Sequence, residues 1–300
     1  MVFLAGFDTL GVLQQIVSGL AQGAIFSSLA LALVLIYRAM NVINFAQGEM
    51  AMFSTFIAFG LITGLHITYW IAFPLTILIS LAGGLLLERV VIRPFEGAPP
   101  LTMVVVTLGL FFIVNGSAGL LWGYLFQTFP SPFPASPINV AGVYIGIRDL
   151  GVMGIVLALL VAVYLILQHT KLGLAMRTAA LYPESARLLG IRVGWMLALG
   201  WGLAAATGAV AGTMVAPIVF LDPNMMQPIL VYAFAAAVLG GIESPIGAVV
   251  GGAVVGVALS LSSYLPGAQN IRNAIALVII VAVLVVRPSG LFGRAQVIKV

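Results

Sequence analysis

The chain alternates long apolar stretches with short polar connections. Hydropathy places the apolar stretches at residues 10–37, 42–65, 67–88, 101–123, 150–168, 195–219, 229–262 and 271–286. A helix that crosses a hydrocarbon core of roughly 30 Å needs about 20 apolar residues. Most of the stretches therefore have the length of a membrane-spanning helix.

The stretch 229–262 is too long for a single crossing. It is interrupted by Gly240, Gly241 and Pro245. This break predicts a short piece at 228–240 and a fuller helix at 245–262. The pattern as a whole predicts an all-α polytopic membrane protein with about eight transmembrane helices plus one short or re-entrant segment.

Basic residues predict the orientation, because Lys and Arg in short loops stay on the cytoplasmic side. They mark alternate connections, at Arg38, Arg89, Arg93, Lys171, Arg177, Arg187 and Arg192. With these connections inside, the N-terminus lies outside. Arg287, Arg294 and Lys299 put the C-terminus in the cytoplasm, provided that 229–262 contributes two passes or a re-entrant hairpin.

The segment 123–149 is expected to form an external loop within a single transmembrane domain that covers residues 1–300. It contains Pro130, Pro132, Pro134 and Pro137, so it is expected to be extended or turn-rich rather than helical. Two alternatives stay open, a disordered linker and an ordered cap that meets a partner.

Small residues recur at GxxxG spacing, which lets helices approach closely in a bilayer. The pairs are Gly19/Gly23, Gly60/Gly64, Gly208/Gly212, Gly247/Gly251 and Gly252/Gly256. Tight packing within the chain is the simpler interpretation, and a subunit interface is the alternative.

Composition excludes several classes of function. Of 300 residues, 62% are hydrophobic and 7% are charged, and the net charge of +4 forms no dense basic stripe for nucleic acid. There is no cysteine, and the two histidines, His66 and His169, lack convergent partners, so the sequence indicates no metal site and no catalytic residue. A GxxxxGK[ST] phosphate loop is also absent, so any nucleotide hydrolysis belongs to another polypeptide.

The first apolar stretch follows Asp8, lacks a basic leader and is longer than the apolar core of a signal peptide, which predicts a retained membrane helix.

The polar residues Asn41, Asn44, Gln47 and Glu49 lie at the start of the second apolar stretch. An ionisable group there is expected to face a cavity or a partner rather than lipid. The spacing indicates a polar stripe along a helix or a broken helix start. One interpretation is the wall of a translocation path. The other is structural, with the amides capping or cross-linking helices and Glu49 at a membrane boundary close to Arg38.

Other amides in the apolar stretches carry a weaker signal of the same kind. They are Gln14, Gln22, Asn115 and Gln127. Interhelical hydrogen bonding accounts for such residues, so none is assigned a substrate role.

The predicted cytoplasmic loop 169–194 contains a candidate docking helix. Pro183 suits its first position, Glu184 complements its N-terminal dipole and Gly190 can end it. Its other residues are Ala186, Arg187, Leu188 and Leu189. The apolar ones form a surface that docks on a partner, or alternatively on the membrane.

At this loop the sequence resembles the branched-chain amino acid ABC-transporter permeases, the LivH/LivM kind, and the likeness extends over nearly the whole chain. The matching motifs are Asn44–Met50, Leu87–Pro94, Gly173–Arg177 with Ala186–Ile191, Val238–Ala248 and Arg287–Gly293. Two positions depart from the family pattern: Gln47 stands where many members have His, and Glu243 where glycine is usual. Both lie in candidate pathway segments, so Glu243 joins the candidate pathway residues.

The resemblance implies a subunit of a heteromeric importer in the bacterial cytoplasmic membrane. Its partners would be a second homologous permease chain, cytoplasmic ATPase subunits that carry ATP and Mg, and an external or periplasmic solute-binding protein. The helix Pro183–Gly190 would then couple to the ATPase, and this chain would hold no cofactor. The expected solute is a branched-chain or related small amino acid. Urea or short amides, and a stand-alone secondary transporter or channel with Glu49 as a cation site, are the alternatives.

Overall fold

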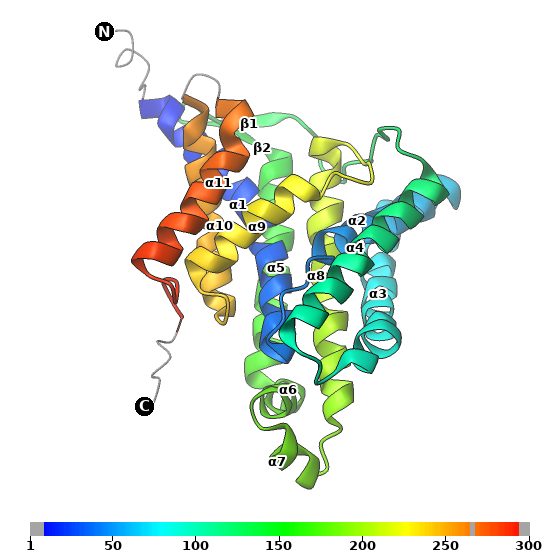
Figure 1. Ribbon diagram of the computed structural model, residues 1–300. Helices are drawn as coiled ribbons and strands as arrows, with labels where there is room; N and C mark the ends of the chain where they lie inside the picture. Colours follow the sequence, from blue (N-terminus) through cyan, green and yellow to red (C-terminus); the bar gives the residue numbers. More distant parts are fainter. Residues whose placement is uncertain (1–8, 265–267, 294–300) are drawn as a thin grey trace.

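The computed structural model describes residues 9–264 and 268–293, so Asp8, Arg294 and Lys299 lie outside the described residues. The described part of the chain is a bundle of helices with one small hairpin (Figure 1). Its helices are α1 (Thr9–Met40), α2 (Gln47–Phe59), α3 (Tyr69–Leu87), α4 (Pro100–Trp122), α5 (Ile147–His169), α6 (Lys171–Leu181), α7 (Pro183–Leu188), α8 (Val193–Val219), α9 (Gln227–Gly240), α10 (Pro245–Leu261) and α11 (Ala268–Val286). The strands are β1 (Pro137–Val140) and β2 (Val143–Gly146), and short turns η1 (Gly60–Gly64), η2 (Glu88–Ile92), η3 (Arg93–Phe95) and η4 (Ser262–Tyr264) extend or link helices.

The predicted class, an all-α polytopic membrane protein, agrees with this architecture. Within the described residues, 6 helices are long and apolar enough to cross a membrane. They are Thr9–Met40, Tyr69–Phe95, Pro100–Trp122, Ile147–His169, Val193–Val219 and Pro245–Tyr264. The predicted break in the stretch 229–262 is confirmed, since α9 ends at Gly240 and α10 begins at Pro245.

The second apolar stretch forms a shorter helix than its length suggested. Residues 41–46 are unwound, α2 has only 13 residues, and a π-helical turn, η1, follows it. The chain reverses at Asn41, whose φ is 53°, before it re-enters the bundle. The broken helix start is therefore what the structure contains, rather than a polar stripe along one continuous helix.

Two helices, α1 and α8, occupy the centre of the bundle. Most of each is buried, whereas only a minority of the residues of α3, α4 and α5 are buried. The exposed side chains of these outer helices are largely apolar, for example Leu78, Val105 and Leu157. Apolar surface of this kind suits contact with lipid, because a water-facing helix would present charged residues instead.

Helices α1 and α10 pack closely against each other through paired glycines. A Cβ at Gly23 would lie 2.7 Å from the carbonyl oxygen of Gly252, so the two backbones leave no room for a side chain. Gly19 and Gly256 meet at the same interface. The glycine pairs of α8 and of early α10 likewise face α2 and α9 of the same chain. Packing within the chain thus accounts for four of the five GxxxG pairs, and only Gly60/Gly64 has nothing within 4 Å.

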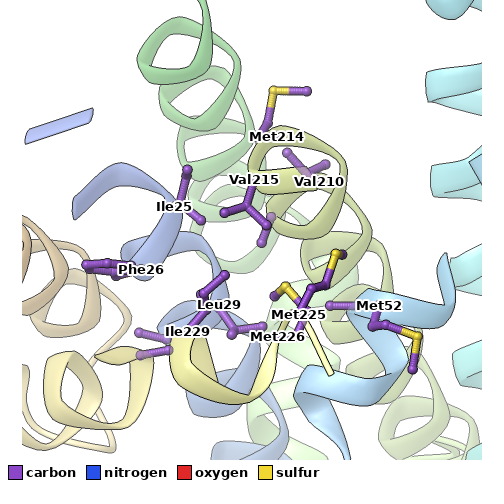
Figure 2. Packing of buried hydrophobic residues seen from close by; sticks show 14 of the residues in the cluster. Ile25, Phe26, Leu29, Met52, Val210, Met214, Val215, Met225, Met226 and Ile229 are labelled. Atoms are coloured by element: carbon purple, nitrogen blue, oxygen red, sulfur yellow. The ribbon is translucent and has the colours of Figure 1, made fainter. Parts of the chain in front are cut away.

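A buried apolar cluster fills the space where α1, α2, α8 and α9 converge. Figure 2 shows labelled side chains of this cluster from all four helices and from the α8–α9 connection. The connection supplies Met225 and Met226, which lie beside Met52 of α2 and Leu29 of α1 (Figure 2). Methionine adapts to irregular gaps, which suits the junction of a half-length helix with a connecting segment.

The hairpin and the short helices α6 and α7 lie at opposite ends of the bundle (Figure 1). β1 and β2 pair antiparallel in the proline-rich segment, which is extended and turn-rich as predicted. The amide N–H of Tyr144 donates to the Gln14 side chain at 2.8 Å, and Phe129 is buried. The segment is thus packed against the bundle, which favours an ordered cap over a disordered linker.

The residues after α11 fold back onto the end of α9. The N–H groups of Leu291 and Phe292 donate to the carbonyls of Leu239 and Gly240 at 2.8 and 3.0 Å. These carbonyls belong to the last turn of α9, which has no intrahelical donors left for them. The motifs Val238–Ala248 and Arg287–Gly293, far apart in the sequence, therefore form one contact.

Candidate functional site

The unwound start of α2 is held by buried amide side chains. The Asn44 side-chain oxygen accepts the N–H of Ala46 at 3.0 Å, and its Nδ2 donates to Gln47 Oε1 at 3.3 Å. Gln47 Nε2 donates in turn to the carbonyl of Ala204 in α8 at 3.1 Å. Both side chains are fully buried. Gln47 thus cross-links the start of α2 to α8, and Asn44 stabilises the turn that precedes α2, which has no side-chain cap.

Glu49 lies two residues after Gln47, in a cluster that joins three elements. Its side chain is 1% exposed, and its Oε2 accepts from Asn115 Nδ2 of α4 at 3.1 Å. The same Asn115 Nδ2 lies 2.9 Å from the Pro223 carbonyl and 3.2 Å from Asn224 Oδ1, both in the α8–α9 connection. Gln227 Nε2 also donates to Asn224 Oδ1, at 2.9 Å, and is within reach of the Glu49 carboxyl. Asn115 therefore ties α4 to α2 and to the α8–α9 connection.

Glu49 takes part in neither of the ion pairs found among the described residues, which are Arg93–Glu88 and Arg187–Glu184. Arg38 lies at the end of α1 and lines a separate cavity, whereas Glu49 is held by amides. The burial of a carboxyl among amides in an apolar bundle marks it as a candidate functional residue.

A cavity of about 600 Å³ opens between α1, α5, α6, α8 and the α9–α10 turn. The predicted pathway residues Asn41 and Glu243 line it, together with Arg38 and Arg177. Much of the remaining wall is apolar and includes Leu31, Leu35, Leu160, Val163, Leu167, Met196 and Leu197. The cavity thus combines both signs of charge with apolar walls.

The structure divides the predicted pathway residues between two places. Asn44, Gln47 and Glu49 lie around the start of α2, and Asn41 and Glu243 lie at the cavity. Sequence reasoning did not find Asn224 and Gln227, which come together with Asn115 only through the fold. Their one signal in the sequence was their position beside the proline-bounded start of α9. The roles of all these residues in transport remain predictions.

The predicted docking helix is present as α7, with Pro183 at its first position and Gly190 (φ 78°) just after its end. Leu188 is 90% exposed and Leu189 is 75% exposed. Ala186 is fully buried against α6 and α8. The helix is therefore anchored on one side and presents two large apolar side chains on the other.

An exposed ion pair accompanies these leucines. Arg187 donates to Glu184 at 3.3 Å, and both side chains are largely exposed. Such a pair contributes little to stability in water. Its charges are available to a partner.

An apolar helical bundle with a half-length internal helix, buried polar clusters and a short helix that exposes apolar side chains is typical of a membrane transport protein. In the described residues, no three His, Asp or Glu side chains come together as a metal site would require.

Comparison with known proteins identifies the kind of transport protein. Residues 15–285 match the family described as branched-chain amino acid transport system, permease component. This chain belongs to that family, whose members are permease components of transport systems and not enzymes.

Several curated relatives are similar over nearly their whole length. The high-affinity branched-chain amino acid transport system permease protein BraD of Pseudomonas aeruginosa is 29% identical, over 96% of this chain and 98% of its own. LivH of Escherichia coli, described in the same words, is 30% identical over 96% and 97%. A probable LivH of Methanocaldococcus jannaschii is 29% identical over 91% of each chain.

Proposed function

We propose that this chain is the transmembrane permease subunit of an ATP-driven importer in the bacterial cytoplasmic membrane. Separate ATPase subunits, which carry the ATP and Mg, would energise it. The observation that carries this proposal is the exposed apolar surface of α7, at the end of the bundle opposite the hairpin. Family membership supports it, because the relatives are named as permease proteins of transport systems.

The proposed orientation rests on the distribution of charge. The basic residues of α6, α7 and the α7–α8 connection lie at one end of the bundle, which the positive-inside rule places in the cytoplasm. The hairpin end then faces the exterior, where an external solute-binding protein would deliver the solute. The outer apolar helices leave room for a second homologous permease chain as well as for lipid.

The proposed solute is a branched-chain or related small amino acid. Such a molecule carries an ammonium group, a carboxylate and an apolar side chain. In the cavity, Glu243 would bind the ammonium group, Arg177 the carboxylate, and the leucine-rich walls the apolar side chain. A neutral solute such as urea carries no charged groups, so it would not require charged residues of both signs in the cavity.

Removing the docking surface of α7 tests the assignment. A variant with Glu184→Ala, Arg187→Ala and Leu188→Asp is expected to insert normally and to lose its ATPase subunits on purification, because all three side chains are exposed and none supports the fold. Lys171→Ala, which removes an exposed charge at the same end, serves as the matched control. Retention of the ATPase by the triple variant would contradict the proposal.

Reconstitution separates the remaining alternatives. The complete complex in liposomes is expected to take up radiolabelled leucine only with ATP and the binding protein. Gradient-driven uptake by this chain alone would instead indicate a secondary transporter or channel. Uptake of urea but not of leucine by the complete complex would assign the chain to the amide-transporting alternative.

A further inference from the structure

The turn after α3 brings two opposite charges together at the predicted cytoplasmic end. η2 is a π-helical turn, in which the N–H of Arg93 donates to the Glu88 carbonyl. In a regular α-helix, residues five apart point roughly 140° away from each other. The wider π turn places them on the same side. Arg93 Nη2 accordingly lies 3.0 Å from Glu88 Oε2, and Arg93 Nε lies 3.4 Å from Glu88 Oε1.

The same guanidinium reaches the first turn of α8. Arg93 Nη2 donates to the Gly194 carbonyl at 2.7 Å. A Cβ at Gly194 would lie 3.1 Å from Arg93 Nη2, so glycine permits this close approach. One turn earlier in η2, the Arg89 guanidinium lies 5.4 Å from the ring centre of Trp195. Two successive contacts therefore fasten the α3–α4 connection to the start of α8.

The start of α8 is also where α7 enters the bundle. Only residues 189–192 separate the two helices. Buried Ala186 of α7 packs in one cluster with Val193 and Leu197 of α8. A displacement of α7 would therefore move the first turn of α8, and with it the carbonyl that Arg93 holds.

We infer that Arg93, oriented by Glu88, is a positioning residue that transmits movement of α7 to α3 and α4. This inference rests on the proposed function, because it needs an ATPase acting on α7. α3 and α4 are outer helices, and α4 carries Asn115, which holds Glu49 and the α8–α9 connection. The Arg93 contact thus lies on a continuous route from the docking helix to the buried cluster at the start of α2.

The buried carboxylate determines how this role can be tested. The Glu88 side chain is 0% exposed and the Arg93 side chain 30%. Replacing Arg93 alone would leave an uncompensated buried charge and would destabilise the fold whatever its role in coupling. Replacing both partners by uncharged side chains of similar size removes that penalty. The informative variant is therefore Glu88→Gln with Arg93→Met, which keeps the volume and removes the bond to Gly194.

The experiment uses the complete complex of permease, ATPase and binding protein in liposomes. For the double variant we expect normal assembly and basal ATP hydrolysis. Solute transported per ATP should fall at least about fivefold, the lower end of usual coupling effects. Glu88→Gln alone keeps the Arg93–Gly194 bond and should retain most of the coupling. Lys171→Met, which removes an exposed charge at the same end, should leave it unchanged.

The outcomes separate this inference from the proposed function. If the double variant assembles and transports as many solute molecules per ATP as the wild type, Arg93 has no transmitting role. If Glu88→Gln alone uncouples as strongly as the double variant, the bond to Gly194 is not the element that matters. If the wild-type chain binds no ATPase, the proposed function itself fails, and the Arg93 variants play no part in that result.

Discussion

Asn115 offers the sharpest test of how the buried cluster holds the bundle together. Its amide donates toward acceptors on two other elements, the Glu49 carboxyl at 3.1 Å and the Pro223 carbonyl at 2.9 Å. Both acceptor residues are buried. Asn115→Leu keeps a similar volume and removes the donor, so both oxygens lose a partner without a large cavity being formed.

The expected cost follows from those two acceptors. A buried polar group left without a partner costs about 1–3 kcal/mol. Asn224 and Gln227 are exposed, so water can reach part of the cluster, and Gln227 remains within reach of Glu49. We therefore expect the free energy of unfolding to fall by about 2–3 kcal/mol, toward the lower end of the sum.

Equilibrium unfolding in mixed detergent micelles measures this difference through tryptophan fluorescence. Trp122, at the end of α4, stacks on Phe56 of α2 with ring centres 5.0 Å apart, so it reports on the same helix contact. The matched control is Ser117→Ala on α4, because within the described part of the chain the Ser117 hydroxyl donates to the Val114 carbonyl of its own helix and to no other helix. This control should change stability by less than about 0.5 kcal/mol.

A double-mutant cycle determines whether the effect belongs to the contact. Glu49→Met with Asn115→Leu replaces both partners by apolar side chains, which can be nearly neutral when shape is kept. The double variant should therefore be at least about 1 kcal/mol more stable than the sum of the single losses predicts. Additive losses, or an Asn115→Leu variant as stable as the wild type, would refute the reasoning.

Three further predictions concern the packing of the bundle. Gly23→Leu should prevent isolation of folded protein, because even a Cβ there would lie 2.7 Å from an α10 carbonyl oxygen. Gly60→Leu, with nothing within 4 Å of its Cβ, should fold. Equal yields of the two variants on gel filtration would contradict this prediction. Gly290→Ala should expose residues 287–293 to protease. Its Cβ would press on the end of α9, and alanine would also be strained by the positive φ of 73° at this position. Gly97→Ala, at a φ of 85° but with open space around it, is the control for the backbone strain alone. Gln14→Ala should speed cleavage of the β1–β2 hairpin by protease, because the Gln14 side chain both accepts from and donates to the backbone of β2. An unchanged cleavage rate would show that this contact does not hold the hairpin.

Asn44 and Gln47 show how far the local sequence can specify a polar feature. Amides in an apolar stretch indicate a helix cap or a cross-link, and the structure contains the cross-link, from Gln47 to α8, while Asn44 bonds within the turn before α2. Gln47 donates to the Ala204 carbonyl, on a helix more than 150 residues later, and nothing in the sequence distinguishes this carbonyl from its neighbours. Backbone acceptors are present at every residue, so a sequence pattern cannot identify which of them a side chain reaches.

The sequence by itself determined the class of the protein and the order of its long apolar helices, but not the short helix α6 (Lys171–Leu181). Runs of apolar residues have few alternatives to membrane helices, because every backbone polar group must be paired inside lipid. It also located the break before Pro245 and the short helix that begins at Pro183, since both depend on proline, glycine and charge at neighbouring positions. These are local properties, and local chemistry is what a sequence displays directly.

Only the tertiary structure decided which distant polar groups meet. It shortened α2, brought Asn115 and Asn224 to Glu49, joined Arg93 to Gly194, and used the α1 and α10 glycines within the chain rather than between chains. Each of these contacts depends on how helices cross and how far their backbones approach. Hydropathy registers only that a residue is apolar or polar, so it determines the presence of a helix but not the neighbours of its polar side chains.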